Sequence, residues 1–252
     1  MYDGSEYNGW QVQPGLPTIQ GTLAAAIERV TGERVLPQGS GRTDAGVHAL
    51  AQVASCALGT PIPAENLVKA LNDVLPASIR VTHAQEVPPD FHARKSARAK
   101  TYRYRILRAA ICSPFVARYV YHHPFPLKED AMGAAAGLVT GEHDFTSFAA
   151  VDPERDSEDE PRSNIRTVFS SCWRRDGDEF TYTVRGSGFL HHMVRNFVGT
   201  FLLVGKGTLE PEAVSRILEA RDRSANPGAT APASGLALVS VEYSGIPDLA
   251  TN

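Results

Sequence analysis

The order of periodic segments along this chain of 252 residues constrains its fold more than any other feature. Patterns typical of helices and of short strands are interspersed, without the strict strand–helix alternation of a parallel α/β protein. The clearest strand pattern lies at 100–107, where Tyr102 and Tyr104 fall on one face and Arg103 and Arg105 on the other. The sequence therefore predicts an α+β fold with largely antiparallel sheets.

Capping residues delimit the first two expected helices. Thr18 suits the N-cap of one helix and Gly32 suits its C-terminal end, while Pro63 suits the start of the next. Periodicity and turn residues predict the remaining elements: a strand within 47–58, strands at 79–86, 100–107, 168–174, 180–185 and 236–243, and helices near 128–139, 190–204 and 210–221.

The order of elements in the second part of the chain echoes the order in the first part. Cys112, Ser113 and Pro114 interrupt the pattern between the two parts. We therefore expect two similar halves, residues 1–110 and 111–252, each built as an antiparallel sheet with helices on one face.

Composition excludes several classes of protein. An apolar fraction of 42% is normal for a packed globular protein, and no apolar run approaches the roughly 18 residues that cross a bilayer. The N-terminal residues lack the features of a signal peptide, so a soluble cytoplasmic protein without a membrane partner is expected. Cys56, Cys112 and Cys172 form no Cys-x-x-Cys pair, and we expect them to be buried small residues, not disulfide or zinc ligands.

The net charge of −3 hides an uneven distribution along the chain. Residues 152–160 contain six acidic residues and one arginine, a net charge of −5, so the rest of the chain carries +2. Residues 94–108 contain seven basic residues and no acidic residue. Such a segment suits an RNA backbone, although a solvated strand face paired with acidic residues elsewhere is the alternative.

Residues 39–46 place three glycines around Arg42 and Asp44, which allows tight backbone conformations and close approach of a ligand. The phosphate-binding pattern Gly-x-x-x-x-Gly-Lys-Ser/Thr and the dinucleotide-binding fingerprint are both absent from the sequence. Composition alone leaves two readings of Asp44 open: a functional carboxylate, or a structural residue that caps local backbone amides.

The string GRTDAGVHA, residues 41–49, resembles the catalytic motif of the tRNA pseudouridine synthase A (TruA) family. Similar motifs occur in the family's order over nearly the whole chain. They are Tyr2-Asp3-Gly4, Gly9-Trp10-Gln11, Thr18-Ile19-Gln20-Gly21-Thr22-Leu23, Asp90-Phe91-His92-Ala93-Arg94, Lys100-Thr101-Tyr102-Arg103-Tyr104, Asp144-Phe145-Thr146-Ser147-Phe148, His191-His192-Met193-Val194-Arg195-Asn196, Thr230-Ala231-Pro232 and Gly235-Leu236.

This resemblance implies the pseudouridine synthase fold, in which two α/β halves meet at a central catalytic cleft. It also implies an isomerase that converts uridine to pseudouridine at positions 38–40 of the tRNA anticodon stem-loop, after the target base has been flipped out. Such an isomerisation needs no metal or cofactor, and none is expected. We do not expect His191 and His192 to bind a metal, since neighbouring helix positions point about 100° apart.

Site residues are carried over from the family by position. Asp44 would be the nucleophile, attacking either the uracil ring or the ribose C1′, and Arg195 would keep it ionised through an ion pair. Tyr102 would stack on the flipped base, and a core aromatic residue is the alternative. Its neighbour Tyr104 is expected to be a core residue, and a structural salt bridge is the alternative for Arg195.

RNA contacts are expected from Arg42, Arg94, Arg103 and Arg105, among other basic residues of 94–108. The family is homodimeric, and a homodimer is expected by resemblance. Two features depart from the family. Only Met1 precedes Tyr2 where relatives carry a strand, so either the start codon was assigned too late or the strand is shortened, which would reduce stability; and 152–160 is acidic. Rival hypotheses are an RNA-binding module without catalysis and a hydrolase with an aspartyl intermediate.

Overall fold

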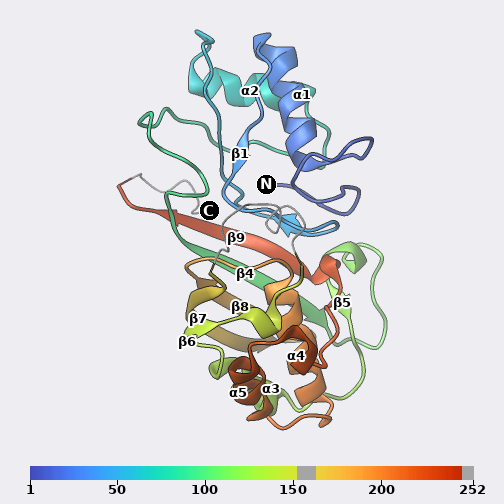
Figure 1. Ribbon diagram of the computed structural model, residues 1–252. Coiled ribbons are helices and arrows are strands. Elements are labelled where there is room, and N and C mark those ends of the chain that lie inside the picture. Colours follow the sequence, from blue (N-terminus) through green and yellow to red (C-terminus); the bar gives the residue numbers. More distant parts are fainter. Residues whose placement is uncertain (152–162, 246–252) are drawn as a thin grey trace. The chain divides into compact units, whose positions relative to one another are not determined.

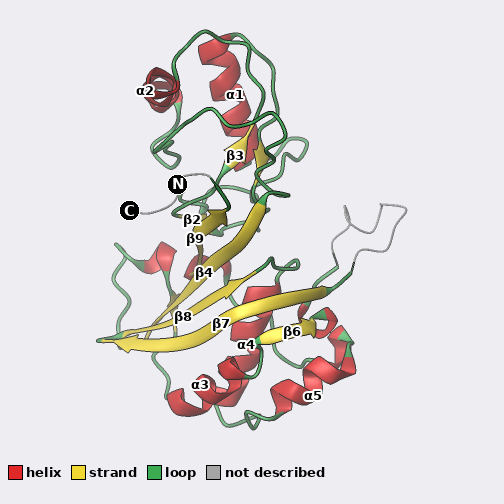
Figure 2. Cartoon of the chain, turned by 90° about the vertical axis from the view of Figure 1, so that its left-hand side faces the viewer, coloured by secondary structure: helices red, strands yellow, loops and turns green. Residues whose placement is uncertain are grey.

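The computed structural model describes residues 1–151 and 163–245. It divides into two compact units (Figures 1 and 2). Unit 1 is formed by Met1–Lys100 with Ala237–Asn252, and unit 2 by Thr101–Leu236. Both units mix helices with strands, so the predicted α+β class is confirmed. The division into halves at 110 and 111 stays a prediction.

Unit 1 contains two helices that pack against each other and several very short strands. The first helix is α1 (Ile19–Thr31), and both of its predicted caps are confirmed. The Thr18 side chain accepts a hydrogen bond from the Gly21 amide, and Gly32 adopts the left-handed conformation at φ 78°. The other elements are α2 (Ala64–Val74), β1 (Gln38–Gly39), β2 (His48–Ala49) and β3 (Ala54–Ser55).

Strand pairing in unit 1 is brief. β1 pairs with β3 in antiparallel orientation, whereas β2 pairs in parallel with β9 (Leu236–Tyr243), the last strand of the chain. β1 and β3 thus form an antiparallel sheet of their own, and the parallel pairing of β2 with β9 belongs to a second sheet. The last strand occupies the residues that the sequence predicted for it.

Two strand predictions in unit 1 were wrong in extent. Of 47–58, only two residue pairs form strands, and 79–86 contains no strand. Ile79 makes a single bridge to Tyr2. Beyond it, the backbone N–H and C=O of Val81 bond to the Asn72 side chain instead of a neighbouring strand. Apolar β-compatible residues form a strand only where a backbone partner lies beside them.

Unit 2 contains long, regular strands. β4 (Ala97–Leu107) leads into it from unit 1, and in the sheet it is followed in order by β8 (Glu179–Gly186), β7 (Ile165–Asp176) and β6 (Gly141–Asp144). The pairs β6–β7 and β7–β8 are antiparallel, and the short β5 (Tyr121–His122) pairs in parallel with β4. The predicted strands at 100–107, 168–174 and 180–185 are confirmed.

Helices of unit 2 pack beside this sheet (Figure 2). The predicted helices are confirmed as α3 (Glu129–Gly137), α4 (Met193–Gly205) and α5 (Ala213–Ala220). In the described part of this unit, short 3-10 turns lie at Ala117–Tyr119, Thr146–Phe148, Arg223–Ala225 and Ala233–Gly235. α4 is almost wholly apolar and carries Phe197 and Phe201, which are fully buried. Phe197 contacts Phe148 with ring centroids 4.9 Å apart, and Phe201 contacts Tyr182 at 5.3 Å. An aromatic core thus joins helix and sheet.

The expected burial of the cysteines was wrong. Cys56 and Cys172 are exposed, and Cys112 is partly exposed. Cys172 lies on β7 opposite Thr183 of β8. Its neighbour in sequence, Ser171, reaches Tyr182 on the buried face, so strand alternation turns Cys172 towards solvent.

The acidic segment 152–160 lies outside the described residues. Within the described parts of the chain, we find no helix with the length and apolarity that a membrane crossing requires.

Candidate active site

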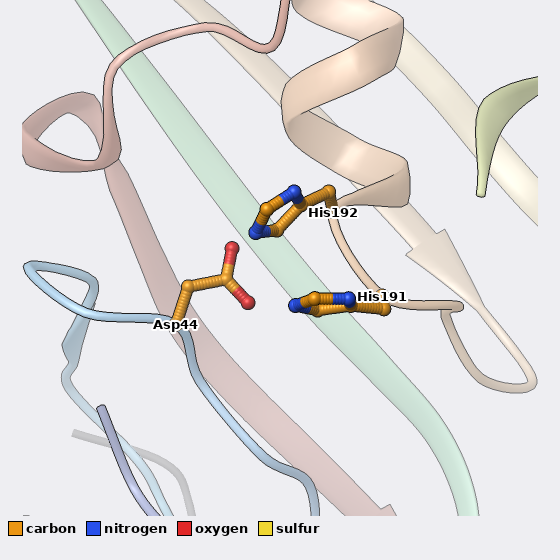
Figure 3. Close-up of side chains that lie close together, drawn as sticks. All are labelled: Asp44, His191 and His192. Atoms are coloured by element: carbon orange, nitrogen blue, oxygen red, sulfur yellow. The ribbon is translucent and has the colours of Figure 1, made fainter. Parts of the chain in front are cut away.

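The loop that carries Asp44 connects β1 and β2 in unit 1. Asp44 is half-buried, and its carbonyl oxygen accepts a hydrogen bond from the Val47 amide at 3.1 Å. Gly46, inside this turn, has φ 77°, a left-handed conformation that glycine adopts without strain. A tight turn therefore begins at Asp44, whose carboxylate is drawn in Figure 3.

The N-terminal segment braces this loop from one side. The Trp10 amide donates to the Thr43 carbonyl oxygen at 2.9 Å, and the Tyr2 hydroxyl lies 2.7 Å from Thr43 Oγ1. Burial raises the pKa of Tyr2 to about 12, so this hydroxyl stays protonated. Gly9 approaches so closely that a Cβ atom there would lie 2.5 Å from the Thr43 carbonyl oxygen. The residue before Asp44 is thus fixed by three contacts.

A second set of contacts holds the start of the loop. The Gln52 amide donates to the Gly41 carbonyl oxygen at 2.9 Å, and Ser40 Oγ donates to Gln52 Oε1 at 2.6 Å. Gly39 packs against the Trp10 ring, where a Cβ would lie 2.5 Å from a ring carbon. Glycine is required at Gly39 for close packing. Gln52 is a site-supporting residue that the sequence analysis missed, because no local pattern marks it.

The Tyr2-Asp3-Gly4 motif lies behind the end of the same loop. The Gly4 amide donates to His48 Nδ1 at 3.1 Å, and a Cβ on Gly4 would lie 2.0 Å from the Val47 carbonyl oxygen. His48 is buried. Motif residues near the start of the chain therefore serve to position the loop of Asp44.

Tyr102 belongs to unit 2 and lies on β4. Its side chain is 7% exposed, and its ring meets Phe189 edge to face, with centroids 5.1 Å apart and an interplanar angle of 84°. Tyr104 is fully buried, and its hydroxyl donates to the Pro232 carbonyl oxygen. Burial raises the pKa of Tyr104. The prediction that Tyr104 is a core residue is confirmed.

Arg195 belongs to unit 2 and lies in the first turns of α4. It is half-buried, and its Nε donates to the Ala231 carbonyl oxygen at 2.7 Å. The Ala231 amide in turn donates to the Arg195 carbonyl oxygen at 3.2 Å. These bonds hold the side chain near the Thr230-Ala231-Pro232 motif. Its ion pair with Asp44 would join the two units and stays a prediction.

Asn196, the next residue, has a structural role that motif matching did not reveal. It is fully buried, and its amide donates to the Phe148 carbonyl oxygen at 2.7 Å. Thr230 donates to its Oδ1 at 2.7 Å. The motif around Arg195 is thus partly a set of core hydrogen bonds that fix α4.

His191 and His192 precede α4 (Figure 3). The expectation that they point apart as neighbouring helix residues was wrong. His192 has φ 59°, a left-handed conformation, and the two ring centroids lie 4.0 Å apart. A backbone turn ahead of the helix therefore brings the imidazoles together. Two imidazoles from one unit do not by themselves make a zinc site, which takes three or four protein ligands.

The four arginines expected to contact RNA differ in their surroundings. Arg42, Arg94 and Arg103 are exposed, and Arg42 Nε donates to Gln11 Oε1 at 3.2 Å. Arg105 is partly buried and forms a two-pronged ion pair with Glu179, with Nε 2.8 Å from Oε2. The hydrogen bonds from Arg105 lower the pKa of Glu179. For Arg105, the structural salt bridge that charge alone left open is present.

Taken unit by unit, the structure supplies different chemical groups. Unit 1 offers the carboxylate of Asp44 on a braced turn, and unit 2 offers the ring of Tyr102 and the guanidinium of Arg195. Neither unit contains all three residues. A reaction that uses all three therefore requires both units.

Sequence comparisons identify similar proteins. A family described as tRNA pseudouridine synthase matches residues 1–94 and 135–244. A tRNA pseudouridine synthase A from Solibacter usitatus is 53% identical over 242 residues, 96% of each chain. Proteins of the same name from Moorella thermoacetica and Brevibacillus brevis are 48% and 44% identical, again over 96% of each chain.

Proposed function

Because the chain belongs to the tRNA pseudouridine synthase family and is an isomerase of that class, we propose that it converts uridine to pseudouridine at positions 38–40 of the tRNA anticodon stem-loop. The nucleophile is Asp44. The observation that carries this assignment is the braced turn of 41–47, in which close glycine contacts fix the backbone on both sides of one half-buried carboxylate.

The chemistry balances without an external reagent. The target uridine leaves its stack, and the Asp44 carboxylate attacks the uracil ring or the ribose C1′. The N1–C1′ bond breaks, the base rotates, and a C5–C1′ bond forms. The bond to Asp44 breaks and frees the carboxylate, C5 loses its proton, and N1 gains one. No electron transfer or hydrolysis occurs, so the proposal includes neither metal nor cofactor.

Two residues of unit 2 complete the proposed site. Tyr102 stacks on the flipped base, which suits a ring already held edge-on by Phe189. Arg195 pairs with Asp44, and its guanidinium keeps the carboxylate charged and therefore nucleophilic. Its Nε donates to the Ala231 carbonyl oxygen, which holds the planar guanidinium in one orientation.

The tRNA substrate is bound through its backbone. Arg42, Arg94 and Arg103 contact phosphates, which suits their exposure. Arg105 contributes only when its pair with Glu179 opens. By analogy with the family, the enzyme works as a homodimer in the cytoplasm, without a membrane partner.

Replacing Asp44 with Asn tests the assignment. We expect pseudouridine formation in tRNA transcripts, mapped at single-base resolution, to fall by about a thousandfold or more, since the amide removes the nucleophile. tRNA affinity and melting temperature should stay within error. The matched control is Asp73→Asn, an exposed aspartate on α2 of the same unit, which should keep full activity.

The rival hypotheses give different results in the same experiment. An RNA-binding module without catalysis would show tRNA binding but no pseudouridine in the wild-type protein. A wild-type protein that modifies other uridines but none at 38–40 would contradict the substrate assignment. Full activity in Asp44→Asn would contradict the mechanism.

A further inference from the structure

A sheet face of unit 2 carries side chains that the proposed mechanism does not use. On β8, Phe180, Tyr182 and Val184 are buried, and Tyr182 contacts Phe201 of α4. Because side chains alternate along a strand, Thr181, Thr183 and Arg185 point to the other face. This second group defines the outer face of the sheet.

An exposed aromatic side chain lies on this outer face at an irregularity in β7. Val168 pairs with Gly186 and Ser170 with Arg185, so Phe169 is an extra residue in the strand, as in a β-bulge. Val168 is buried, whereas Phe169 is 43% exposed. Alternation from the buried Val168 turns Phe169 outward, and the extra residue leaves Ser170 on the same face, opposite Arg185. Bulges often redirect a side chain towards a binding site.

Arg185 lies against this exposed ring. Its guanidinium carbon is 4.9 Å from the centroid of Phe169, within the range of a cation–π contact. The pair therefore presents a flat aromatic surface and a positive charge side by side. Stacking on an aromatic ring together with contact to an arginine is how proteins bind unpaired nucleotides.

The surroundings of the pair favour RNA over an acidic or apolar partner. The strand segments 165–175 and 180–186 contain four arginines and no acidic residue. Acidic side chains gather instead at the hairpin end, at 176–179. On the outer face, Ser170, Thr181 and Thr183 add hydroxyl groups that can bond to phosphate or ribose.

We propose that Phe169 and Arg185 form a platform on which an unpaired nucleotide of the tRNA substrate stacks, with its phosphate bound by Arg185. The base lies against Phe169, while the hydroxyls of Ser170 and Thr183 line the path of the backbone. This inference rests on the proposed function for the identity of the RNA. It adds positioning residues outside the catalytic group.

Binding measurements test the platform directly. The Asp44→Asn protein is titrated with a labelled anticodon stem-loop, whose loop nucleotides are unpaired, and with a blunt RNA duplex. In this Asp44→Asn protein, we expect the further substitution Phe169→Ala to weaken stem-loop binding about tenfold and duplex binding by less than about twofold. The reason is that only unpaired bases can stack on the ring. Phe169→Trp should keep the stem-loop affinity within about twofold.

Arg185→Gln should weaken binding of both RNAs and reduce the salt dependence by about one phosphate contact. Ile165→Ala is the control, because Ile165 is another exposed apolar residue of β7, 51% exposed, away from the bulge. Melting temperatures of all variants are measured alongside. If Phe169→Ala fails to fold, Phe169→Leu, which keeps apolar volume but no ring, replaces it.

Three outcomes would overturn the platform: unchanged stem-loop affinity in Phe169→Ala, equal losses for stem-loop and duplex, or an equal loss in Phe169→Trp. Its failure is distinguishable from failure of the proposed function. Wild-type protein that forms pseudouridine at 38–40 while Phe169→Ala binds normally contradicts the platform alone. Wild-type protein without isomerase activity whose stem-loop binding depends on Phe169 contradicts the proposed function alone.

Discussion

The two units hold their functional residues in different ways. Unit 1 fixes Asp44 with two-residue strands, isolated hydrogen bonds and glycines in close contact. Unit 2 carries Tyr102 and Arg195 on a strand of 11 residues and a helix of 13 residues, above an aromatic core. The catalytic loop thus depends on individual contacts, whereas the other groups depend on cooperative packing.

A cavity in unit 1 is a further difference between the two units. Unit 1 contains a partly open cavity of about 270 Å³, which is lined mainly by apolar side chains of α1 and α2 and by the segments 52–58 and 79–87. Tyr2 lies between two segments and forms one antiparallel bridge to each, to Ala49 and to Ile79. Among the described residues, no backbone hydrogen bond joins 50–58 directly to 80–87. We therefore expect unit 1 to be the less stable unit.

The chain offers a direct reporter for each unit. Its two tryptophans are Trp10, in unit 1, and Trp173, in unit 2. Fluorescence of the Trp173→Phe protein follows unit 1, and that of the Trp10→Phe protein follows unit 2.

The largest effect is expected from Gly199→Ala in α4. A Cβ there would lie 1.7 Å from the Ala229 carbonyl oxygen, so helix and loop must separate. We expect the free energy of unfolding of unit 2 to fall by about 3 kcal/mol or more. Gly133→Ala in α3, where a Cβ meets open space, is the control and should stabilise by about 0.5–1 kcal/mol. Equal effects of the two substitutions, measured by urea unfolding, would contradict the packing argument.

The next effect is expected from Gly9→Ala. The new Cβ would lie 2.5 Å from the Thr43 carbonyl oxygen, and φ at this position is 82°. We expect a loss of about 2 kcal/mol in unit 1 and a larger loss of isomerase activity, since the turn at Asp44 shifts. Gly15→Ala, at φ 72° with no atom nearby, should cost about 1 kcal/mol and leave activity intact. Unchanged activity in Gly9→Ala would show that the brace is dispensable.

A smaller, stabilising effect is expected from filling the cavity. Tyr2 bridges Ala49 on one side and Ile79 on the other. An extended segment of five residues with alternating valines, joined ahead of Met1, would pair in the same way with 51–55 on one side and 81–85 on the other. We expect unit 1 to gain about 1–2 kcal/mol, read from Trp10 fluorescence during urea unfolding. A Gly-Ser segment of equal length is the control. Equal stability of both proteins would mean that the cavity does not accept a strand.

The smallest effect is expected at the ion pair of unit 2. Arg105 lowers the pKa of Glu179, so the pair contributes stability above the unfolded pKa of about 4.5, and this contribution is lost as pH falls through the lower folded value. Both side chains are about one-third exposed, so solvent screening limits the contribution to less than about 1 kcal/mol. Glu179→Gln should lower the melting temperature at pH 7, and the difference should shrink below pH 4. A difference that persists there would exclude the ion pair as its cause.

Local patterns predicted much of the fold. Thr18 and Gly32 delimit α1 because capping depends on the helix ends alone. β4 and β9 were found because period-two alternation records which face is buried. The 79–86 prediction failed because the same apolar pattern lacks a neighbouring strand, and a sequence pattern does not contain its partner.

The sequence by itself determined the family, the α+β class and Asp44 as the candidate nucleophile, because these follow from contiguous motifs and local periodicity. Only the tertiary structure decided that Gln52 and Trp10 brace the catalytic turn, that Arg105 is paired with Glu179, and that Phe169 faces solvent beside Arg185. Each of these depends on residues far apart in the chain or on strand register. Their contacts arise only when the backbone has folded, so no local pattern encodes them.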